Sequence, residues 1–444
     1  MMMVQFSVFF TTYHTTTAAV VNLFFADVAP HVSIRYDKNA AIDDWMGVET
    51  MAKVILKRKR KKRLEQGHPW IFQSEVDRIE GDVAPGDFVD IYNHQGYWLA
   101  KGYINPASQI IVRVLTQNPN DELDERFFID RIRQAWAYRE RMIPGVRSCR
   151  AVYGEADFLP GLIVDKYEDV LVVQILALGM EKRKDWILRG LLDVFAPRAI
   201  YLRNDVSVRE LEGLKQEKGF WYGESETEIE IEENGVKYIV DIENGQKTGF
   251  FFDQRQNRAA LRPLIGPETT VLDCFTHTGS FMLNACLYGA KHATAVDISE
   301  HAIETAKRNA ALNGFTNVEF VVANAFDYLR ESVRAGKQWD VVIIDPPAFA
   351  KSAHAVPKAL RGYKDINLNG LKLVKDGGFF VTSSCSYHVR PHLFQEMIAD
   401  AAFDAKKVLR QVYWNGAGYD HPKLLAAEEG DYLKFAIYEV YSRR

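Results

Sequence analysis

The sequence predicts an α/β protein, in which a doubly wound, mostly parallel sheet is preceded by a small β-barrel and by an α+β domain. Three observations lead to this prediction. From residue 243 onward, short apolar runs alternate with segments of helical periodicity. Within residues 52–118, short strands follow one another with turn residues between them. Within residues 119–242, strands and amphipathic helices are mixed.

The composition is that of an ordinary globular chain without a strong charge bias. The chain has 444 residues, 47% of them hydrophobic, and a formal net charge of −4, which suits two to three domains. No run of about 18 apolar residues indicates a membrane span. The four cysteines show neither a Cys-x-x-Cys pair nor zinc-site spacing, which predicts no metal and is typical of a reduced, cytoplasmic protein. Because the whole chain is not basic, any nucleic-acid surface has to be local.

Residues 1–51 differ from the rest of the chain. No Lys or Arg occurs before Arg35, so neither a secretory signal nor a transit peptide is indicated. Met51 directly precedes the first well-patterned segment. We interpret residues 1–51 as an extension that arises from an upstream start site assigned in error; the alternative is a real but disordered extension.

Residues 52–118 carry the densest basic run of the chain, from Lys57 to Arg63, which includes Lys59, Arg60 and Lys61. Strands are expected at 88–92, 97–103 and 110–115, with turn residues between them. Basic side chains on a small barrel with aromatic neighbours favour contact with RNA phosphates. The alternative is a solvated charged face.

Residues 119–242 are expected to form the α+β domain. Helices are predicted over 124–141 and 182–195. Strands are predicted at the following positions: 162–165, 170–176, 199–203 and 235–242. Nothing in this segment indicates a particular chemistry.

Residues 243–444 alternate strand and helix. Five buried strands are predicted, at 269–275, 292–297, 318–322, 341–344 and 379–383. The tail over 431–441 alternates apolar residues and predicts a late strand, for which an antiparallel direction is one of the two options. In such a sheet, ligands bind outside the carboxyl ends of the strands. The residues that follow each strand are therefore the candidate site.

The first three strand ends predict a site for an adenosyl ligand. The first strand runs into a turn with Gly279 but lacks the G-x-G-x-x-G pattern, so a dinucleotide fits less well. Asp297 ends the second strand, 24 residues after Asp273, where a carboxylate accepts hydrogen bonds from ribose. An adenosyl group without a pyrophosphate predicts S-adenosylmethionine as the cofactor. The candidate residues at these strand ends are Asp273, Phe275, Thr278, Gly279, Asp297, Asn324 and Ala325. The alternative for Asp297 is a helix N-cap, with Ser299 as a rival cap.

The segment over 245–255 precedes the first of these strands. Lys247 and Arg255 are expected to pair with the methionine carboxylate of the cofactor or to order the site. Gln254 of the same segment is a further candidate for cofactor binding. The three phenylalanines at 250–252 are interpreted as core residues.

Asp345 follows the fourth strand and Cys385 follows the fifth, 40 residues later. Neighbouring strands lie about 4.8 Å apart, so both side chains can reach one flat ring. A thiolate that adds to C6 of cytosine activates C5 for methylation. A carboxyl group with a raised pKa, Asp345, stabilises the ring during this addition and also borders the cofactor. The alternative for Cys385 is a buried structural thiol. Pro346 and Pro347 fix the backbone beyond Asp345, and Phe349 is expected to stack on the extruded base.

From about residue 52 to residue 444, the chain resembles the bacterial 23S rRNA (cytosine-C5) methyltransferases. The segments that carry the resemblance are 67–72, 159–165, 247–258, 273–279, 345–349 and 384–386. The resemblance implies a PUA-like first domain and a Rossmann-like class I methyltransferase domain that uses S-adenosylmethionine. It also implies 23S rRNA as the substrate, Cys385 as the nucleophile, contact of Asp345 with the target base, and homodimers. Other RNA cytosine-C5 methyltransferases carry a second cysteine after the proline of the Asp-Pro motif. Here that neighbourhood has no thiol.

Two alternatives remain open at this point. An RNA methyltransferase acting on an exocyclic base amine also uses an Asp-Pro-Pro segment, although an aromatic residue usually follows, where this chain has Ala348. A non-catalytic ribosome assembly factor is the second alternative. The combination of Asp297, Asp345 and Cys385 argues against it.

Overall fold

The computed structural model describes residues 51–443. The predicted extension over 1–51 therefore lies, except for Met51, outside the described residues.

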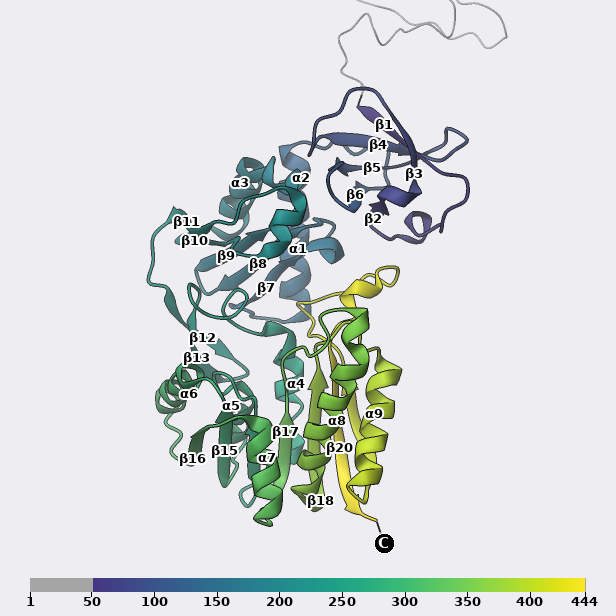
Figure 1. Ribbon diagram of the computed structural model, residues 1–444. Coiled ribbons are helices and arrows are strands. Elements are labelled where there is room, and N and C mark those ends of the chain that lie inside the picture. The colour runs from purple at the N-terminus through teal and green to yellow at the C-terminus, as the bar shows by residue number, and fades with distance from the viewer. Residues whose placement is uncertain (1–50, 444) are drawn as a thin grey trace, which may run out of the picture. The chain divides into compact units, whose positions relative to one another are not determined.

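The first part of the described chain is a six-stranded sheet with the order β2-β6-β5-β4-β1-β3 (Figure 1). Its strands are β1 (Ala52–Leu56), β2 (Trp70–Phe72), β3 (Val76–Glu80), β4 (Phe88–Tyr92), β5 (Trp98–Ile104) and β6 (Ile110–Thr116). The last three match the predicted strands; β1, β2 and β3 are additional. Val54, Ile91 and Val112 contribute to one buried cluster, because alternate residues of a strand point to the same face.

A second, five-stranded sheet has the order β11-β10-β9-β8-β7. Its strands are β7 (Cys149–Tyr153), β8 (Leu162–Tyr167), β9 (Val170–Ile175), β10 (Ala199–Arg203) and β11 (Lys218–Gly223). The helices of this part are α1 (Glu125–Met142), α2 (Leu178–Glu181) and α3 (Lys184–Phe195). Helix α1 begins after Asp124, whose side chain accepts a hydrogen bond from the backbone N–H of Phe127 at 2.9 Å. Phe128 and Ile132 of α1 pack into the same core as Leu191 of α3.

A two-stranded hairpin, β12 (Glu228–Glu233) and β13 (Val236–Asp241), follows. Ile229 and Ile231 are buried, whereas Glu228 and Glu230, which alternate with them, are exposed. The buried residues belong to the core beneath helix α5 (Ser280–Leu287). The strand predicted at 235–242 therefore pairs with β12 and does not extend the second sheet.

The third sheet has seven strands in the order β16-β15-β14-β17-β18-β20-β19. Its strands are β14 (Thr270–Cys274), β15 (His292–Asp297), β16 (Val318–Val322), β17 (Trp339–Ile344), β18 (Val374–Ser384), β19 (Lys407–Asn415) and β20 (Lys434–Ser442). β14 to β18 pair in parallel, and β20 runs antiparallel to β18. The predicted doubly wound sheet and its late antiparallel strand are confirmed. The edge strand β19 was not predicted.

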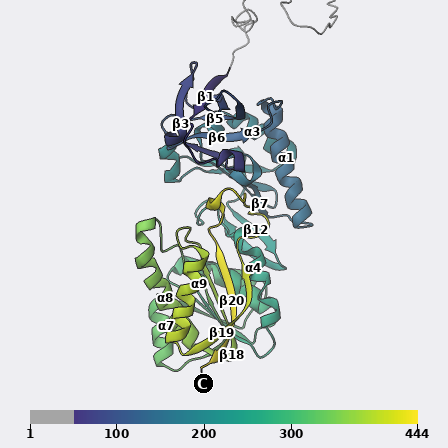
Figure 2. The same cartoon turned by 90° about the vertical axis from the view of Figure 1, so that its right-hand side faces the viewer.

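Helices cover both faces of this sheet. α5 and α6 (Glu300–Leu312) belong to one core with Val271 and Val341. α7 (Ala325–Arg334), α8 (Val356–Lys372) and α9 (Pro391–Asp404) belong to the other core with Leu272 and Val342. Successive strand residues alternate between the two cores, as the pleat requires. Figure 2 shows α7, α8 and α9 together on one side of the sheet.

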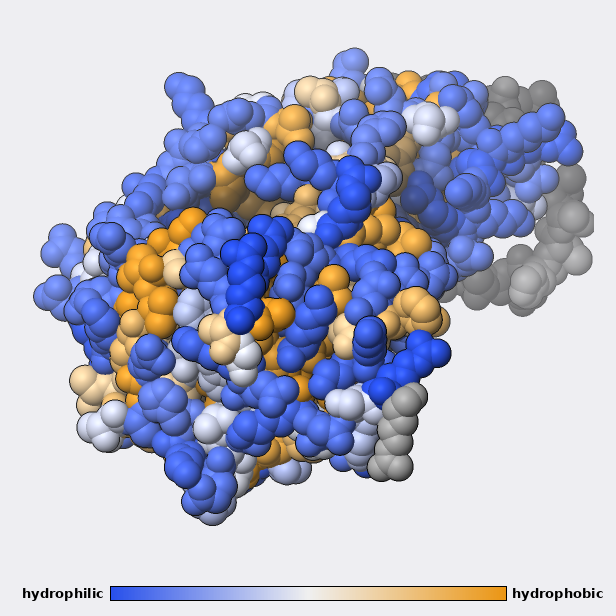
Figure 3. All heavy atoms as spheres, turned by 60° about the horizontal axis from the view of Figure 1, so that its bottom comes forward, coloured by the Kyte–Doolittle hydropathy of each residue, from blue (hydrophilic) through white to orange (hydrophobic). Residues whose placement is uncertain are grey.

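No helix in the described range 51–443 is long and apolar enough to cross a bilayer. On the face that Figure 3 shows, hydrophilic side chains predominate, with apolar patches between them.

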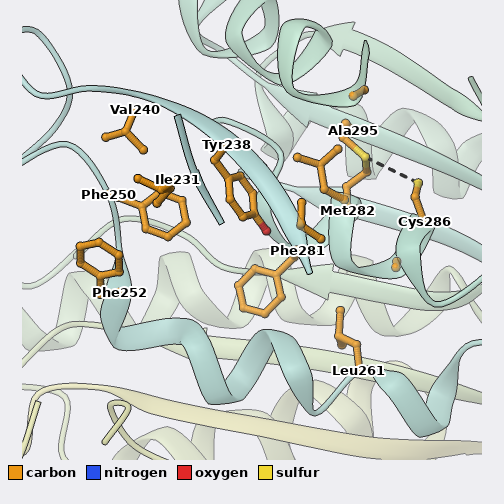
Figure 4. Packing of buried hydrophobic residues seen from close by; sticks show 14 of the residues in the cluster. Ile231, Tyr238, Val240, Phe250, Phe252, Leu261, Phe281, Met282, Cys286 and Ala295 are labelled. Carbon is orange, nitrogen blue, oxygen red and sulfur yellow. Dashed lines mark hydrogen bonds between the residues drawn. The ribbon is translucent and has the colours of Figure 1, made fainter. Parts of the chain in front are cut away.

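The segment between the hairpin and the third sheet is tied to helix α5. Phe250 and Phe252 are buried, and the ring of Phe250 lies 5.0 Å from that of Tyr238. The hydroxyl of Tyr238 accepts a hydrogen bond from Asn284 Nδ2 at 2.8 Å. Figure 4 shows Tyr238 and Phe250 packed near Phe281. Two of the three phenylalanines are core residues, as predicted. Phe251 instead contacts the ring of His277 at 5.3 Å.

Candidate active site

The strand order reverses between β14 and β17, which are parallel neighbours at the centre of the sheet. From β14 to β16 the chain proceeds toward one edge of the sheet, and from β17 onward it proceeds toward the other. The backbone N–H of Asp345 points to the carbonyl oxygen of Cys274 at 3.5 Å. In open α/β sheets, ligands bind at such a switch point, outside the carboxyl ends of the strands. Asp345 and the turn after Cys274 lie at these ends.

Asp345 and Ser383 lie on neighbouring strands, because β17 pairs with β18 and Ile344 is opposite Thr382. The Ser383 hydroxyl donates a hydrogen bond to Oδ1 of Asp345. Nε2 of Gln254 lies 3.2 Å from each of the two carboxylate oxygens. Burial raises the pKa of Asp345 to about 6; the Ser383 hydrogen bond opposes this rise and the charge of Asp253 adds to it. The carboxyl group is therefore partly protonated near neutral pH.

Cys385 is half-buried, whereas Cys149, Cys274 and Cys286 are buried. Its Sγ lies 3.9 Å from the carbonyl oxygen of Pro346, which accepts from the thiol. Burial raises the pKa of Cys385 to about 11, and the negative charges of Asp345 and Asp253 add to the rise. Cys385 at rest is a neutral thiol, so a reaction that uses its thiolate requires a proton acceptor.

Asp253 was not among the predicted site residues. It is buried, and its Oδ2 accepts a hydrogen bond from the Tyr432 hydroxyl at 2.6 Å. Its Oδ1 is buried and has no hydrogen-bond partner among the described residues. Although burial acts in the opposite direction, the charges of Lys247 and His421 lower the pKa of Asp253 to about 2. A fixed negative charge therefore stands beside Asp345 and Cys385.

Lys434 was also missed. It begins β20 and lies opposite Ser384, the residue before Cys385. Its side chain is buried, and its Nζ donates to the carbonyl oxygens of Ser386 and Tyr432 at 2.7 Å each. The sequence did contain a signal, because Lys434 is a charged residue at the start of a continuous apolar run over 435–438.

The loop that follows β14 has an unusual backbone. Phe275 and His277 have φ values of +62° and +53°, and Gly279 has +87°. Non-glycine residues in this region are strained and cluster at ligand sites. A Cβ on Gly279 would lie 2.9 Å from Cε of Met282. Thr278, between them, is half-buried, and its carbonyl oxygen accepts from Asn309 Nδ2 at 3.0 Å.

Asp273 is buried at the end of β14. Its Oδ2 accepts hydrogen bonds from the Thr276 hydroxyl at 2.6 Å and from the backbone N–H of Met282 at 3.1 Å. Its Oδ1 is buried without a hydrogen-bond partner among the described residues. Burial raises the pKa of Asp273 to about 7, and the nearby charges of Asp345 and Asp297 add to the rise. This oxygen remains available to accept a hydrogen bond from a ligand.

Asp297 does not cap the helix after it. Ser299 is the N-cap of α6, and its Oγ accepts from the backbone N–H of Ala302 at 3.2 Å. The Asp297 carboxylate accepts from the backbone N–H groups of His277 at 3.0 Å and Ser299 at 2.9 Å. It thereby ties the end of β15 to the strained loop after β14.

Asn324 is exposed, and its side-chain oxygen caps α7 by accepting from the backbone N–H of Phe326 at 2.9 Å. The sequence analysis did not anticipate this cap. Ala325, which follows, is buried. Because the side-chain oxygen of Asn324 is used in the cap, its amide nitrogen is the group that can donate a hydrogen bond to a ligand.

The segment before β14 divides into different roles. Lys247 is exposed and its Nζ lies 4.9 Å from the ring centroid of Phe251. The Arg255 guanidinium is buried against the Ser148 carbonyl oxygen and Oε2 of Glu233, the latter 3.5 Å from Nε. Protein groups therefore surround Arg255. This arrangement favours the second of its two predicted roles, the ordering of the site.

The residues after Asp345 form part of an aromatic row. The Phe349 ring lies 4.5 Å from that of Tyr363 and 5.9 Å from that of Phe326, and Phe326 in turn lies 6.4 Å from Phe275. Pro346 is buried and Pro347 is exposed. Phe349 therefore has ring partners within the protein. The sequence analysis predicted that it stacks on the target base and did not predict these partners.

In the basic run, Lys59 and Lys61 are exposed. Arg60 instead makes two hydrogen bonds to Glu65, at 2.9 Å and 2.6 Å. Its guanidinium is already paired with a carboxylate, which the sequence analysis did not anticipate.

The residues at the first strand ends fit S-adenosylmethionine. The unpartnered Oδ1 of Asp273 is buried as an acceptor, and the Asp297 carboxylate stands at the next strand end. The absence of a side chain at Gly279 lets the loop pack closely on Met282 of α5 and Ala306 of α6, which fixes its position at the strand end. The loop segment over 275–279 itself contains no arginine or lysine.

Comparison with known proteins adds the family. Residues 54–117 match the family described as a PUA-like domain, and residues 265–429 match a methyltransferase domain. A ribosomal RNA large subunit methyltransferase I from Aliivibrio fischeri is 43% identical over 386 residues, which cover 86% of this chain and 97% of the relative. The protein of the same name from Alteromonas mediterranea is 39% identical and covers 88% and 99%.

Among solved structures, a SAM-dependent methyltransferase from Streptococcus mutans has a TM-score of 0.73 at 21% identity, covering 87% of this chain and 99% of its own. A methyltransferase solved in complex with SAH has a TM-score of 0.74, also at 21% identity, with the same coverage. These likenesses confirm the predicted fold class, with a PUA-like part and a class I methyltransferase sheet. The expected methyltransferase with S-adenosylmethionine as its cofactor is likewise confirmed. The chain belongs to the ribosomal RNA large subunit methyltransferase I family.

Proposed function

We propose that this protein transfers a methyl group from S-adenosylmethionine to C5 of a cytosine in 23S rRNA, through a covalent bond between Cys385 and C6. The observation that carries the proposal is the position of the Cys385 thiol. It is the half-buried cysteine, it follows β18, and it points to the carbonyl of Pro346, next to Asp345 of the neighbouring strand.

The first step forms the bond between sulfur and C6. The Cys385 thiol releases its proton to solvent, and the sulfur electron pair attacks C6. The ring electrons shift toward N3, which takes a proton from the carboxyl group of Asp345. With a pKa of about 6, Asp345 retains a protonated fraction at neutral pH. Gln254 and Ser383 hold this carboxyl group in place.

The second step uses the electron-rich C5 that the first step creates. S-adenosylmethionine supplies an electrophilic methyl group at this stage. Afterwards C5 carries both the methyl group and its original proton. Removal of that proton restores the C5–C6 double bond and expels the Cys385 thiolate, while Asp345 recovers the proton from N3. No residue is assigned to the removal of the C5 proton.

The residues proposed to hold the cofactor are those at the first three strand ends. Asp273 presents its free Oδ1, and Asp297 accepts from the ribose hydroxyls. Phe275, Thr278 and Gly279 form the loop between them. The remaining proposed contacts are Asn324, Ala325, Asp345, Gln254 and Lys247.

The exposed lysines Lys59 and Lys61 are proposed to contact rRNA phosphates. Arg60 contributes less directly, because it is paired with Glu65. A homodimer, which the family resemblance implies, is part of the proposal; a sedimentation mass of one chain at micromolar concentration would remove it.

The test is methyl transfer from labelled S-adenosylmethionine to 23S rRNA that lacks its native modifications, followed by mass analysis of the nucleosides. Wild type is expected to give 5-methylcytidine, and Cys385→Ala is expected to give none. Cys286→Ala is the matched control, because Cys286 is a buried thiol of helix α5.

Transfer that survives in Cys385→Ala would contradict the thiol mechanism, and a methylated exocyclic amine would point to the amine reaction. If both proteins bind S-adenosylmethionine but transfer nothing to the RNA, the assembly-factor alternative gains support.

A further inference from the structure

The chain directly after Asp345 is a local concentration of positive charge. Residues 346–364 contain no Asp or Glu, although the formal net charge of the whole chain is −4. This stretch consists of the loop that follows β17 and the first half of helix α8. Its residues that are charged at neutral pH are all basic, namely Lys351, Lys358, Arg361 and Lys364.

Three of these four cations have no partner within the protein. Lys364 forms ion pairs with two aspartates of α9, at 2.9 Å and 3.9 Å. The side chains of Lys351, Lys358 and Arg361 are exposed, and no carboxylate among residues 51–443 forms an ion pair with them. Like charges that lie three residues apart on a helix repel each other. Lys358 and Arg361 are such a pair, and an anion bound between them would relieve the repulsion.

Backbone contacts place Lys351 beside the end of β18. The N–H of Ala350, the residue before it, donates to Oγ of Ser386 at 3.1 Å. Ser386 directly follows Cys385, whose Sγ lies 3.9 Å from the carbonyl oxygen of Pro346 in the same loop. Consecutive Cα atoms are about 3.8 Å apart. Lys351 is therefore one residue away from a contact that is itself one residue away from the thiol.

The start of helix α8 is anchored to the same loop. The hydroxyl of Tyr363 lies 2.9 Å from Oγ of Ser386, and its ring lies 4.5 Å from that of Phe349. A Cβ on Gly362 would lie 3.4 Å from Cδ2 of Phe349. These contacts fix the first two turns of α8 against the loop that carries Lys351.

Lys358 and Arg361 lie on these two turns. Lys358 precedes Gly362 by four residues, so the two share one face of the helix, and Arg361 follows Lys358 at the next neighbouring position of that surface. Because Gly362 packs on Phe349, this face borders the loop after β17. The three unpaired cations therefore continue from the loop onto the first turns of α8.

We propose that Lys351, Lys358 and Arg361, here called the basic track, form a second RNA-binding surface that holds phosphates next to the cytidine attacked by Cys385. The basic track rests on the proposed function, because it assigns a backbone contact for the same RNA to the methyltransferase part of the chain. An enzyme that reacts on a base takes that base out of the stack. The strand on either side of the extruded base then brings its phosphates to the reacting edge, where cations neutralise them.

The basic track differs from the basic run over 57–63 in its distance from the chemistry along the fold. The run belongs to the PUA-like part, in which Lys59 and Lys61 are proposed to contact phosphates. The basic track belongs to the methyltransferase part and lies beside the end of β18. Phosphate contacts fix the register and orientation of a nucleic acid without reading its sequence. Contacts beside the thiol therefore position the target base, whichever nucleotides surround it.

The experiment measures the salt dependence of binding between the full-length protein and transcribed 23S rRNA fragments. One variant combines Lys351→Ala, Lys358→Ala and Arg361→Ala. Each phosphate contact to a single strand contributes about 0.7 to the slope of log affinity against log salt, so the slope is expected to fall by about 2. Affinity at about 150 mM salt is expected to fall at least tenfold, roughly the counter-ion release that three contacts supply.

The matched control removes the same charge from the opposite edge of the sheet. Arg334 and Lys337 precede β17, and Lys372 precedes β18; all three are exposed. They therefore stand at the amino ends of the strands that Asp345 and Cys385 follow. β17 has six residues, which span about 20 Å. A variant with alanine at all three control positions is expected to keep the wild-type slope.

A folded basic-track variant with the wild-type slope would overturn the inference. A control variant that loses the same slope would overturn it as well, because net charge and not position would then explain the effect. Lys351→Gln alone changes one exposed loop residue and is expected to lower the slope by about 0.7, so an unchanged slope in this variant counts against the basic track even if the triple variant does not fold.

Binding requires neither a methyl donor nor the thiol, and Cys385→Ala is expected to keep the wild-type slope. A failure of the methyl-transfer test would therefore leave the measured slopes unchanged. An unchanged slope in the basic-track variant would likewise leave the Cys385→Ala methylation test intact.

Discussion

The hydroxyl of Ser383 donates a hydrogen bond to the carboxylate of Asp345 across the β17–β18 pair. This contact works against burial, which raises the pKa of Asp345 to about 6. The balance of the two keeps the carboxyl group able to change its protonation state near neutral pH.

Ser383→Ala should raise the pKa of Asp345 further, because a hydrogen bond that favours the charged form is lost. The limb of the pH–rate profile that belongs to Asp345 is expected to move to higher pH by about one unit. Single-turnover methyl transfer between pH 5 and 9 measures this limb. Ser384→Ala is the matched control at the next position. A midpoint that stays in place or moves to lower pH would show that Ser383 does not set this pKa.

Gly279→Ala should weaken cofactor binding and the fold together. Gly279 has a φ of +87°, and its Cβ would lie 2.9 Å from Cε of Met282 and 3.2 Å from Cβ of Ala306. Gly289 has a φ of +95°, and a Cβ added there would have no atom within 4 Å. Gly289→Ala therefore carries the backbone strain without the contacts, about 1 kcal/mol of stability.

Thermal unfolding and calorimetric binding of S-adenosylmethionine distinguish the two variants. Gly279→Ala is expected to lose more stability than Gly289→Ala and to bind the cofactor at least tenfold more weakly. Gly289→Ala should bind normally. Equal binding by both would mean that the loop after β14 does not contact the cofactor.

Asp273→Asn should make the folded protein more stable near pH 8 and weaken its binding of S-adenosylmethionine. The folded-state pKa of Asp273 is raised to about 7 from 3.8, so folding favours the protonated form. Wild type therefore loses stability as the pH rises from about 4 to about 7, and the full cost is present above pH 7. An asparagine carries no charge at any pH. The variant is expected to be more stable than wild type by about 1 to 3 kcal/mol at pH 8, with no advantage near pH 4.

The same variant should bind S-adenosylmethionine more weakly, because the buried Oδ1 is the proposed acceptor. Chemical denaturation at pH 4, 6 and 8 and calorimetry at pH 8 measure both effects. A variant that is less stable than wild type at pH 8 would contradict the raised pKa.

Of the three predicted RNA-contacting residues in the basic run, we expect only Lys59 and Lys61 to contribute measurably to phosphate binding. Lys59 and Lys61 are exposed, whereas Arg60 is bound to Glu65. Lys59→Ala with Lys61→Ala is expected to reduce the salt slope of RNA binding by about 1.5 to 2. Arg60→Ala alone should change that slope little. Filter binding to 23S rRNA fragments between 50 and 300 mM salt measures the slopes, and an unchanged slope in the double variant would assign the run to solvation.

The apolar runs along the sequence were sufficient to predict the five parallel strands of the third sheet and the residues that follow them. Apolar runs that end in Asp273, Asp297, Asp345 and Cys385 were visible without a structure. Parallel strands bring their carboxyl ends to one edge, so residues far apart in sequence meet there for a reason that does not depend on side-chain detail. The late strand β20 was predicted from apolar residues that alternate over 431–441, whereas in the structure all five residues from Lys434 to Tyr438 are buried.

Only the tertiary structure decided which side chains surround these strand ends. Gln254 meets Asp345 across 91 residues of sequence, and Lys434 meets the Ser386 carbonyl across 48. The pairing of Arg60 with Glu65, which the sequence analysis did not anticipate, likewise depends on the local fold. A periodic pattern determines which face of an element is buried, whereas the partner of a polar side chain depends on how separate elements pack. The sequence therefore determined which residues stand at the strand ends, and the packing of β20 against β18 decided that Lys434 lies beside them.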